Sequence, residues 1–154
     1  MRLPITEPGE FKKVDIAQVE RMVDEFIARG FTYFDTAYMY HDFESERIMR
    51  ETLVKRHPRN SYTLTTKLPV MMLKTEEDQE RVFNEQLEKC GVDFFDFYLL
   101  HSINLKTYSR AKRLDSFGFV QRKRDEGKIR HIGMSFHDTA DLLDEILTEH
   151  PELE

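Results

Sequence analysis

Residues 31–37, Phe-Thr-Tyr-Phe-Asp-Thr-Ala, form a short apolar run rich in aromatic and β-branched side chains. Such a run is typical of a strand, and it begins directly after Gly30, a usual residue for ending a helix. A helix is expected before it, because Asp15 can cap a segment whose apolar residues recur at helical spacing. We therefore predict a helix followed by a strand, with Asp35 at the carboxyl end of that strand.

The same alternation continues along the chain. Further strand-like runs lie at residues 62–68, 94–100 and 129–135, with a remnant of an earlier strand at residues 2–4. Amphipathic helices are expected from Ser45 to Pro58, from Thr75 to Gly91, around residues 117–126, and from Asp138 or Thr139 towards Pro151. Strands separated by single helices form right-handed βαβ units and a parallel sheet. The sheet is then either a doubly wound open sheet or a (β/α) barrel.

Polar residues at the strand ends favour the barrel. Asp35, Lys67, His101 and Ser135 each follow or end one of the four predicted strands. In a parallel barrel these ends open on one face, which is where active sites lie. The doubly wound open sheet is less favoured, because the sequence has neither the G-x-G-x-x-G motif nor the Walker-type loop that nucleotide-binding sheets of this kind usually carry. Taken singly, each residue has a simpler interpretation, such as a helix cap or a solvated charge, but the joint pattern favours an active site.

The chemistry that fits this set, with Tyr40, is carbonyl reduction. A free tyrosine phenol is a poor acid at neutral pH, and a nearby lysine ammonium favours the phenolate. Asp35 can supply the counter-charge that keeps a buried Lys67 ionised. His101 can donate a hydrogen bond to the substrate oxygen while Tyr40 delivers the proton. Since no side chain donates hydride, the reaction needs a cofactor.

These residues resemble the aldo/keto reductase family. Residues 35–40, Asp-Thr-Ala-Tyr-Met-Tyr, followed by Ser45-Glu46, are similar to the family's D-T-A-x-x-Y signature and its trailing acidic position. Residues 65–67 resemble its lysine strand, residues 98–101 its histidine strand, and residues 127–135 its G-K-I-R-x-I-G-x-S segment.

The resemblance implies a role for each residue. Tyr40 would be the proton donor, Lys67 and Asp35 would tune its acidity, and His101 would orient the substrate. Ser135 would hydrogen-bond the nicotinamide carboxamide, with Asp35 lining the same cofactor pocket. The implied activity is an oxidoreductase that uses NADPH, or NADH, to interconvert a small-molecule carbonyl and an alcohol.

The resemblance also places the chain within the family. Its opening and residues 135–138 are similar to bacterial members with a ferredoxin-like C-terminal extension, although one cysteine cannot hold iron–sulfur clusters. Relatives commonly have Asn where this chain has Phe136, the residue after the nicotinamide serine.

The length of 154 residues is short for this fold, because a complete barrel takes roughly 250 residues. We therefore expect residues 1–154 to form a single truncated domain, a partial (β/α)8 TIM barrel of about the first five βα units. In the family, the later half supplies much of the cofactor site, so the chain alone is expected to be a weak or inactive enzyme. Its open edges predict a homo-oligomer or a complementing chain.

Composition excludes several other classes of protein. The net charge of -6 gives no footprint for nucleic acid or an anionic membrane, and no apolar run is long enough to cross a bilayer. The single cysteine, Cys90, excludes a disulfide framework, and a cytoplasmic location is expected. The histidines have no spacing typical of a metal site, so no metal is predicted.

Two other functions remain as alternatives. One is a non-catalytic interaction module or subunit that retains the aldo/keto reductase scaffold, which the intact set of catalytic residues disfavours. The other is a Schiff-base aldolase with Lys67 as nucleophile. A neighbouring Asp35 would oppose the deprotonated lysine that such an enzyme needs, so we rank it below the reductase.

Overall fold

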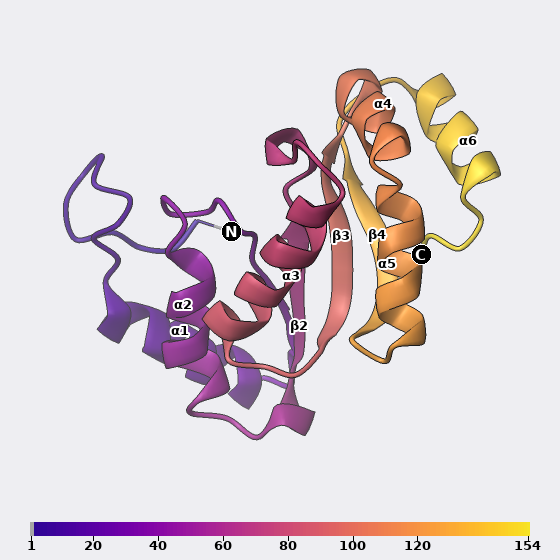
Figure 1. Cartoon of the computed structure of the whole chain (residues 1–154). Coiled ribbons are helices and arrows are strands. Elements are labelled where there is room, and N and C mark those ends of the chain that lie inside the picture. The colour runs from indigo at the N-terminus through magenta and orange to yellow at the C-terminus, as the bar shows by residue number, and fades with distance from the viewer. Residues whose placement is uncertain (1) are drawn as a thin grey trace.

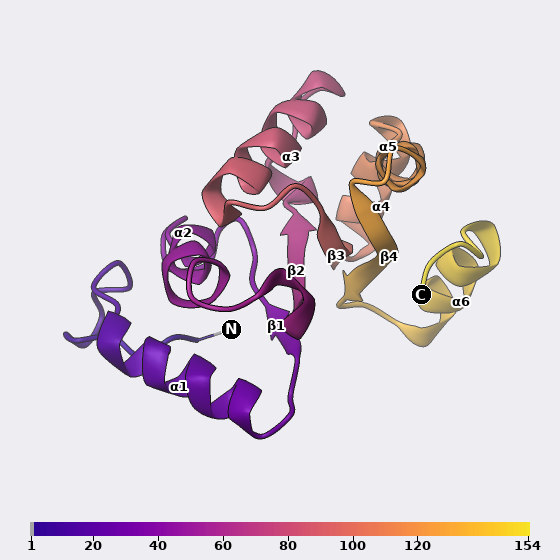
Figure 2. The same cartoon turned by 90° about the horizontal axis from the view of Figure 1, so that it is seen from below.

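The computed structural model describes residues 2–154 and has a four-stranded parallel sheet at its centre. The strands are β1 (Tyr33–Asp35), β2 (Thr63–Leu68), β3 (Phe95–Ile103) and β4 (Ile129–Phe136), and they lie side by side in chain order. Seen along the strands, the helices form an arc on the outside of the sheet (Figure 2). This is the arrangement of a partial (β/α) barrel, and the described residues contribute four strands to it rather than the five units expected.

The helices that precede, connect and follow the strands are shown in Figure 1. They are α1 (Ile16–Ala28), α2 (Ser45–Met49), α3 (Glu77–Cys90), α4 (Leu105–Arg113), α5 (Ser116–Asp125) and α6 (Ala140–Glu149). The π-helical turn η1 (Arg50–Val54) extends α2, and two short 3-10 turns, η2 (Arg59–Ser61) and η3 (Val70–Met72), flank β2. Within residues 2–154, no helix combines the length and apolar character needed to cross a membrane.

Local sequence signals account for several helix ends. The Asp15 side chain accepts a hydrogen bond of 2.9 Å from the backbone N–H of Gln18 and so caps α1. Gly91 ends α3 with a φ of 68°, in the left-handed region that glycine tolerates. The Asp78 carboxylate accepts the N–H of Thr75 at 3.2 Å, which stabilises the turn that enters α3.

Three predictions about elements are wrong. Residues 105–113 form the helix α4, which was not predicted from the sequence; Asn104 and Thr107 make a reciprocal capping box at its start. Ser45 is the first residue of α2 rather than its cap, because its hydroxyl instead lies 2.8 Å from that of Thr36. Residues 2–4 are not a sheet strand; next to them, Ile5 makes one antiparallel bridge with Val14.

The core lies between the sheet and its helices. Alternate strand side chains face the helices and are fully buried, among them Leu64, Tyr98, Leu100 and Ile132. The intervening side chains point to the other face, where Tyr33 keeps 47% of its surface exposed and Phe97 stacks on His131 with ring centroids 4.8 Å apart. The site described below lies at the carboxyl ends of the strands on this face.

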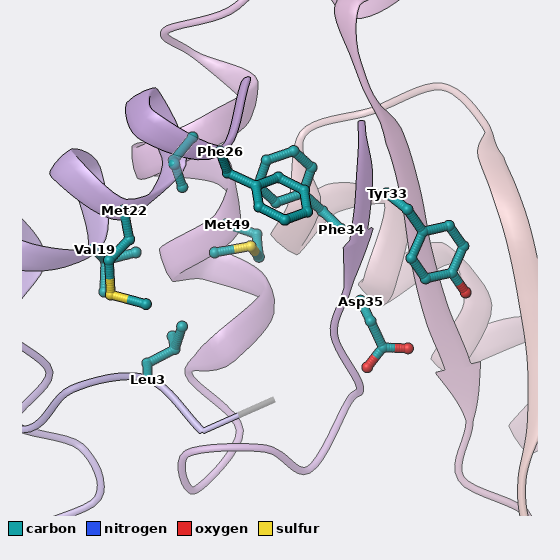
Figure 3. A pocket seen from close by; sticks show the side chains of 9 residues that line it. Leu3, Val19, Met22, Phe26, Tyr33, Phe34, Asp35 and Met49 are labelled. Atoms are coloured by element: carbon teal, nitrogen blue, oxygen red, sulfur yellow. The ribbon is translucent and has the colours of Figure 1, made fainter. Parts of the chain in front are cut away.

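The two edges of the sheet differ. At β1, a groove with a cavity volume of about 340 Å³ separates the strand from α1 and is lined mainly by apolar side chains such as Val19, Phe26, Phe34 and Met49 (Figure 3). At β4, the backbone N–H of Glu154 donates a 2.9 Å hydrogen bond to the carbonyl of Ile132.

Candidate active site

Lys67 is the buried centre of the candidate site. It lies near the end of β2, and its side chain is only 5% exposed. Its ammonium group donates to both oxygens of Asp35, at 2.8 and 2.7 Å, and to the backbone carbonyl of Thr36 at 2.7 Å. The parallel register of β1 and β2 places Asp35 beside Thr65, two residues before the lysine. The three donors of the ammonium therefore have acceptors, which offsets the cost of burying the charge.

Tyr40 lies in the loop that follows β1. The Lys67 Nζ atom is 5.0 Å from the centre of the half-buried Tyr40 ring. Figure 3 shows Asp35 on the opposite side of β1 from Phe34, which points into the apolar groove. Asp35 also lines the groove, but its carboxylate accepts from the Lys67 ammonium, which lies close to the Tyr40 ring.

The loop that carries Tyr40 is strained. His41, Asp42 and Phe43 have φ values of 51°, 51° and 72°, a left-handed conformation that costs energy in residues other than glycine. The imidazole of His41 holds the loop, because its Nε2 accepts from the N–H of Leu3 at 2.9 Å. Its Nδ1, which then carries the proton, donates to the carbonyl of Phe11 at 2.9 Å.

His101 approaches the tyrosine from β3. Its ring lies 5.7 Å from that of Tyr40, in an edge-to-face arrangement at 82°. Burial lowers the pKa of His101 to about 4, and the positive charge of Lys67 acts in the same direction. The imidazole is therefore neutral near pH 7. Within residues 2–154, its buried Nδ1 has no hydrogen-bond partner.

Ser135 lies near the end of β4, one strand away from this group. Its hydroxyl oxygen accepts a 2.7 Å hydrogen bond from the N–H of Ser102, the residue after His101. A shift in register between Leu100 and Ile103 turns the backbone here, and Ser102 has a φ of 55°. Ser135 is thus coupled to the histidine strand, while Asp35, Lys67, Tyr40 and His101 form one continuous cluster.

Some groups that shape this cluster could not be predicted from the sequence. The Thr36 carbonyl that accepts from Lys67 is a main-chain group, so no side chain marks it in the sequence. The hydrogen bond from the Leu3 N–H to His41 depends on the packing of segments that are far apart in the sequence. Within the part of the chain that the structure describes, no three His, Cys, Asp or Glu residues are close enough to hold a metal ion.

Comparisons with known proteins identify the family to which this fold belongs. The sequence profile of the aldo/keto reductase family matches residues 2–154. An aldo-keto reductase of Mycolicibacterium vanbaalenii is 31% identical over 133 residues, which cover 85% of this chain and 44% of that protein. One from Mycobacterium avium is 29% identical over 152 residues, which cover 99% of this chain and 50% of that protein.

Solved structures give the same result. An aldo/keto reductase from Brucella melitensis superimposes with a TM-score of 0.66 at 26% identity, over 90% of this chain and 51% of that one. An aldo-keto reductase from Klebsiella pneumoniae, in complex with NADPH, gives a TM-score of 0.60 at 25% identity, over 92% and 46%. The chain thus spans about half the length of the relatives it matches. Since the family profile covers nearly every residue, the chain belongs to the aldo/keto reductase family.

Proposed function

We propose that this chain carries the proton-transfer part of an NAD(P)H-dependent site that reduces a small carbonyl compound to an alcohol. The observation that carries the proposal is the position of the Lys67 ammonium, which is fixed by Asp35 and Thr36 and lies 5.0 Å from the Tyr40 ring centre. A cation next to a phenol stabilises the phenolate, so it makes the phenol a better proton donor. Tyr40 is then the general acid.

The proposed reaction adds a hydride to the carbonyl carbon of the substrate and a proton to its oxygen. A bound nicotinamide would supply hydride to the carbonyl carbon, and the electron pair of the C=O π bond would move to oxygen. That oxygen takes the proton from the Tyr40 hydroxyl, and the phenolate left behind is stabilised by Lys67. His101 is neutral near pH 7, so it can donate a hydrogen bond that orients the substrate without adding a second positive charge beside Lys67.

The residues present fit part of a nicotinamide site. The Ser135 oxygen accepts the Ser102 N–H, so the hydroxyl hydrogen remains available to a carboxamide oxygen. Asp35 is 34% exposed and faces the same end of the sheet. The Klebsiella pneumoniae relative was solved in complex with NADPH. We therefore propose NADPH, or NADH, as the cofactor, with Ser135 and Asp35 among its contacts.

The test is reduction of a reactive aldehyde by the chain, measured as the decrease in NADPH absorbance. Tyr40→Phe removes only the phenolic hydroxyl, and we expect a fall in kcat of roughly 10²–10⁴-fold, the usual contribution of a general acid. The matched control is Tyr38→Phe, the same change at a side chain whose hydroxyl donates to Glu85 on α3. Turnover by Tyr40→Phe at the wild-type rate would contradict the proposal.

A second candidate is a non-catalytic interaction module that retains the scaffold. The groove at β1 and the exposed aromatic face favour it, because such surfaces are normally covered. It predicts that the chain binds a polypeptide at its open edges, whether a second copy or a complementing chain, and shows no turnover that depends on Tyr40. Measurable turnover by the wild type that Tyr40→Phe lowers would therefore favour the reductase over the interaction module.

A further inference from the structure

Glu46 is a buried acid that the proposed reaction does not use. It is the second residue of α2 and is completely shielded from solvent. One carboxyl oxygen accepts from the hydroxyl of Thr66 and from the side-chain amide of Gln86, both at 2.6 Å. Burial raises the pKa of Glu46, and these two hydrogen bonds oppose that shift. A buried carboxyl group is costly, and an apolar side chain of similar size would fill the space at lower cost.

Gln86 connects this acid to the lysine strand. It projects from α3 and is fully buried. Its amide nitrogen is also 3.1 Å from the backbone carbonyl of Lys67, and its oxygen accepts from the Tyr98 hydroxyl at 2.5 Å. Glu46, Thr66 and Gln86 therefore fix the main chain of β2 at the position from which the Lys67 side chain leaves.

The residue before Glu46 fixes the other end of the same lysine. The Ser45 hydroxyl lies 2.8 Å from that of Thr36, whose carbonyl accepts from the Lys67 ammonium. Consecutive residues at the start of α2 thus reach both ends of Lys67, one through Thr36 and the other through Thr66. The ammonium is held between two strands whose relative position is set by one helix start.

We propose that Glu46 is a positioning residue for Lys67, acting through Thr66 and Gln86. This inference rests on the proposed function, in which the lysine must lie close to both Asp35 and Tyr40. A displacement of about 1 Å at such a group can reduce a reaction rate by roughly 10²-fold. Glu46 touches neither substrate nor cofactor in this scheme.

The test follows the Lys67 ammonium itself in the full chain, by 1H–15N NMR of lysine-labelled protein. A buried ammonium with three acceptors exchanges its hydrogens slowly with water, and Lys67→Met assigns the signal. In Glu46→Leu we expect exchange to become at least about tenfold faster, which corresponds to the loss of one buried hydrogen bond. Gln86→Met removes the donor to the Lys67 carbonyl and should have the same effect.

Two variants serve as controls. Glu46→Gln keeps a side-chain oxygen that can accept from Thr66 and Gln86, so it should exchange like wild type. Thr52→Val removes another buried hydroxyl, one that bonds to the Ile48 carbonyl within the same helical segment, and should also leave exchange unchanged. Circular dichroism and thermal unfolding confirm that each variant is folded. If Glu46→Leu does not fold, Gln86→Met decides.

Unchanged exchange in folded Glu46→Leu or Gln86→Met would overturn the inference. Equally fast exchange of the Lys67 ammonium in Thr52→Val, or loss of its slow signal in Glu46→Gln, would also overturn the inference. In either case, loss of the Glu46 acceptor oxygen could not be the cause. The measurement needs no turnover. If Tyr40→Phe turned over at the wild-type rate, the proposed reaction would be wrong, but the exchange result would still stand. Likewise, unchanged exchange would contradict the positioning role of Glu46 without contradicting the proposed reaction.

Discussion

His101 combines burial with a neighbouring cation, and both lower its pKa, to about 4. In the unfolded chain a histidine has a pKa of about 6.5. Between these values the unfolded state binds a proton that the folded state does not. The contribution of His101 to the free energy of unfolding is therefore fully present above about pH 6.5 and is lost as the pH drops towards 4. We expect wild type to lose about 1–2 kcal/mol more between pH 7 and pH 5 than His101→Gln.

Urea unfolding of both proteins at the two pH values measures this difference. Carboxyl groups with lowered pKa values, such as Asp78 at about 2, also weaken the fold in acid. They are present in both proteins, so their contribution cancels in the comparison. An equal loss of stability in wild type and His101→Gln would mean that this imidazole is not neutral in the folded state.

At the level of single residues, the sequence predicts which side chains lie at the carboxyl ends of the strands. Asp35, Lys67 and His101 are close together because parallel strands bring equivalent positions to one edge. Their roles in catalysis stay predictions. The sequence could not reveal that Gln86 reaches the Lys67 carbonyl, because that contact depends on how α3 packs against β2.

At the level of elements, the four strands are predicted from their apolar runs, since strands covered by helices are rich in apolar side chains. The helix α4 was missed because five of its nine residues are Lys, Arg or Ser, which hide a narrow buried stripe of Thr107, Tyr108 and Ala111. The Asn104 and Thr107 pair was the available signal. The π-helical turn after α2 has no signature in the sequence that we recognise.

Asp96 ties several elements together at the opposite end of the sheet. Its carboxylate, 2% exposed, accepts from Arg59 at 2.6 Å, from Arg130 at 2.9 Å and from the N–H of Leu64 at 2.8 Å. The two guanidinium groups lie 4.1 and 4.2 Å from the ring centre of Phe94. This group links η2, β2, β3 and β4 at the amino ends of the strands.

We predict that Asp96→Ala destabilises the protein by roughly 1–3 kcal/mol, because it leaves the buried N–H of Leu64 without its acceptor and removes two ion pairs with arginines. Arg130→Met is the control: its side chain is 59% exposed, so the lost ion pair should cost about 1 kcal/mol or less. Denaturant unfolding at neutral pH gives both values. Equal costs for the two variants would show that the carboxylate contributes no more than a surface ion pair.

On the scale of the whole molecule, helices cover only one face of the sheet (Figure 2). The groove at β1 continues into exposed aromatic side chains, including Phe31 at 55% and Tyr33 at 47% exposure. The length of the sequence predicts an incomplete barrel. It could not predict that β1 has three residues or that the Glu154 backbone pairs with β4, because both depend on contacts between segments that are far apart in the sequence.

We expect the chain to associate through this surface, with itself or with a complementing chain, because exposed apolar edges of a sheet pair readily. Light scattering after size-exclusion chromatography should give a mass above that of a monomer, and Tyr33→Lys should shift it towards the monomer. Glu88→Gln, which changes the net charge equally on the exposed side of α3, should leave the mass unchanged. A wild-type monomer at high concentration would refute this expectation.

The left-handed loop after Tyr40 has a consequence for protein engineering. Glycine usually weakens a folded protein, because it adds freedom to the unfolded chain. Asp42 is exposed and has a φ of 51°, so Asp42→Gly should instead raise the thermal unfolding midpoint, through relief of up to about 1 kcal/mol of backbone strain. The same substitution at Asp141, in the first turn of α6, should lower the midpoint. The thermostability of the protein could then be adjusted at a single exposed position in the loop that follows Tyr40.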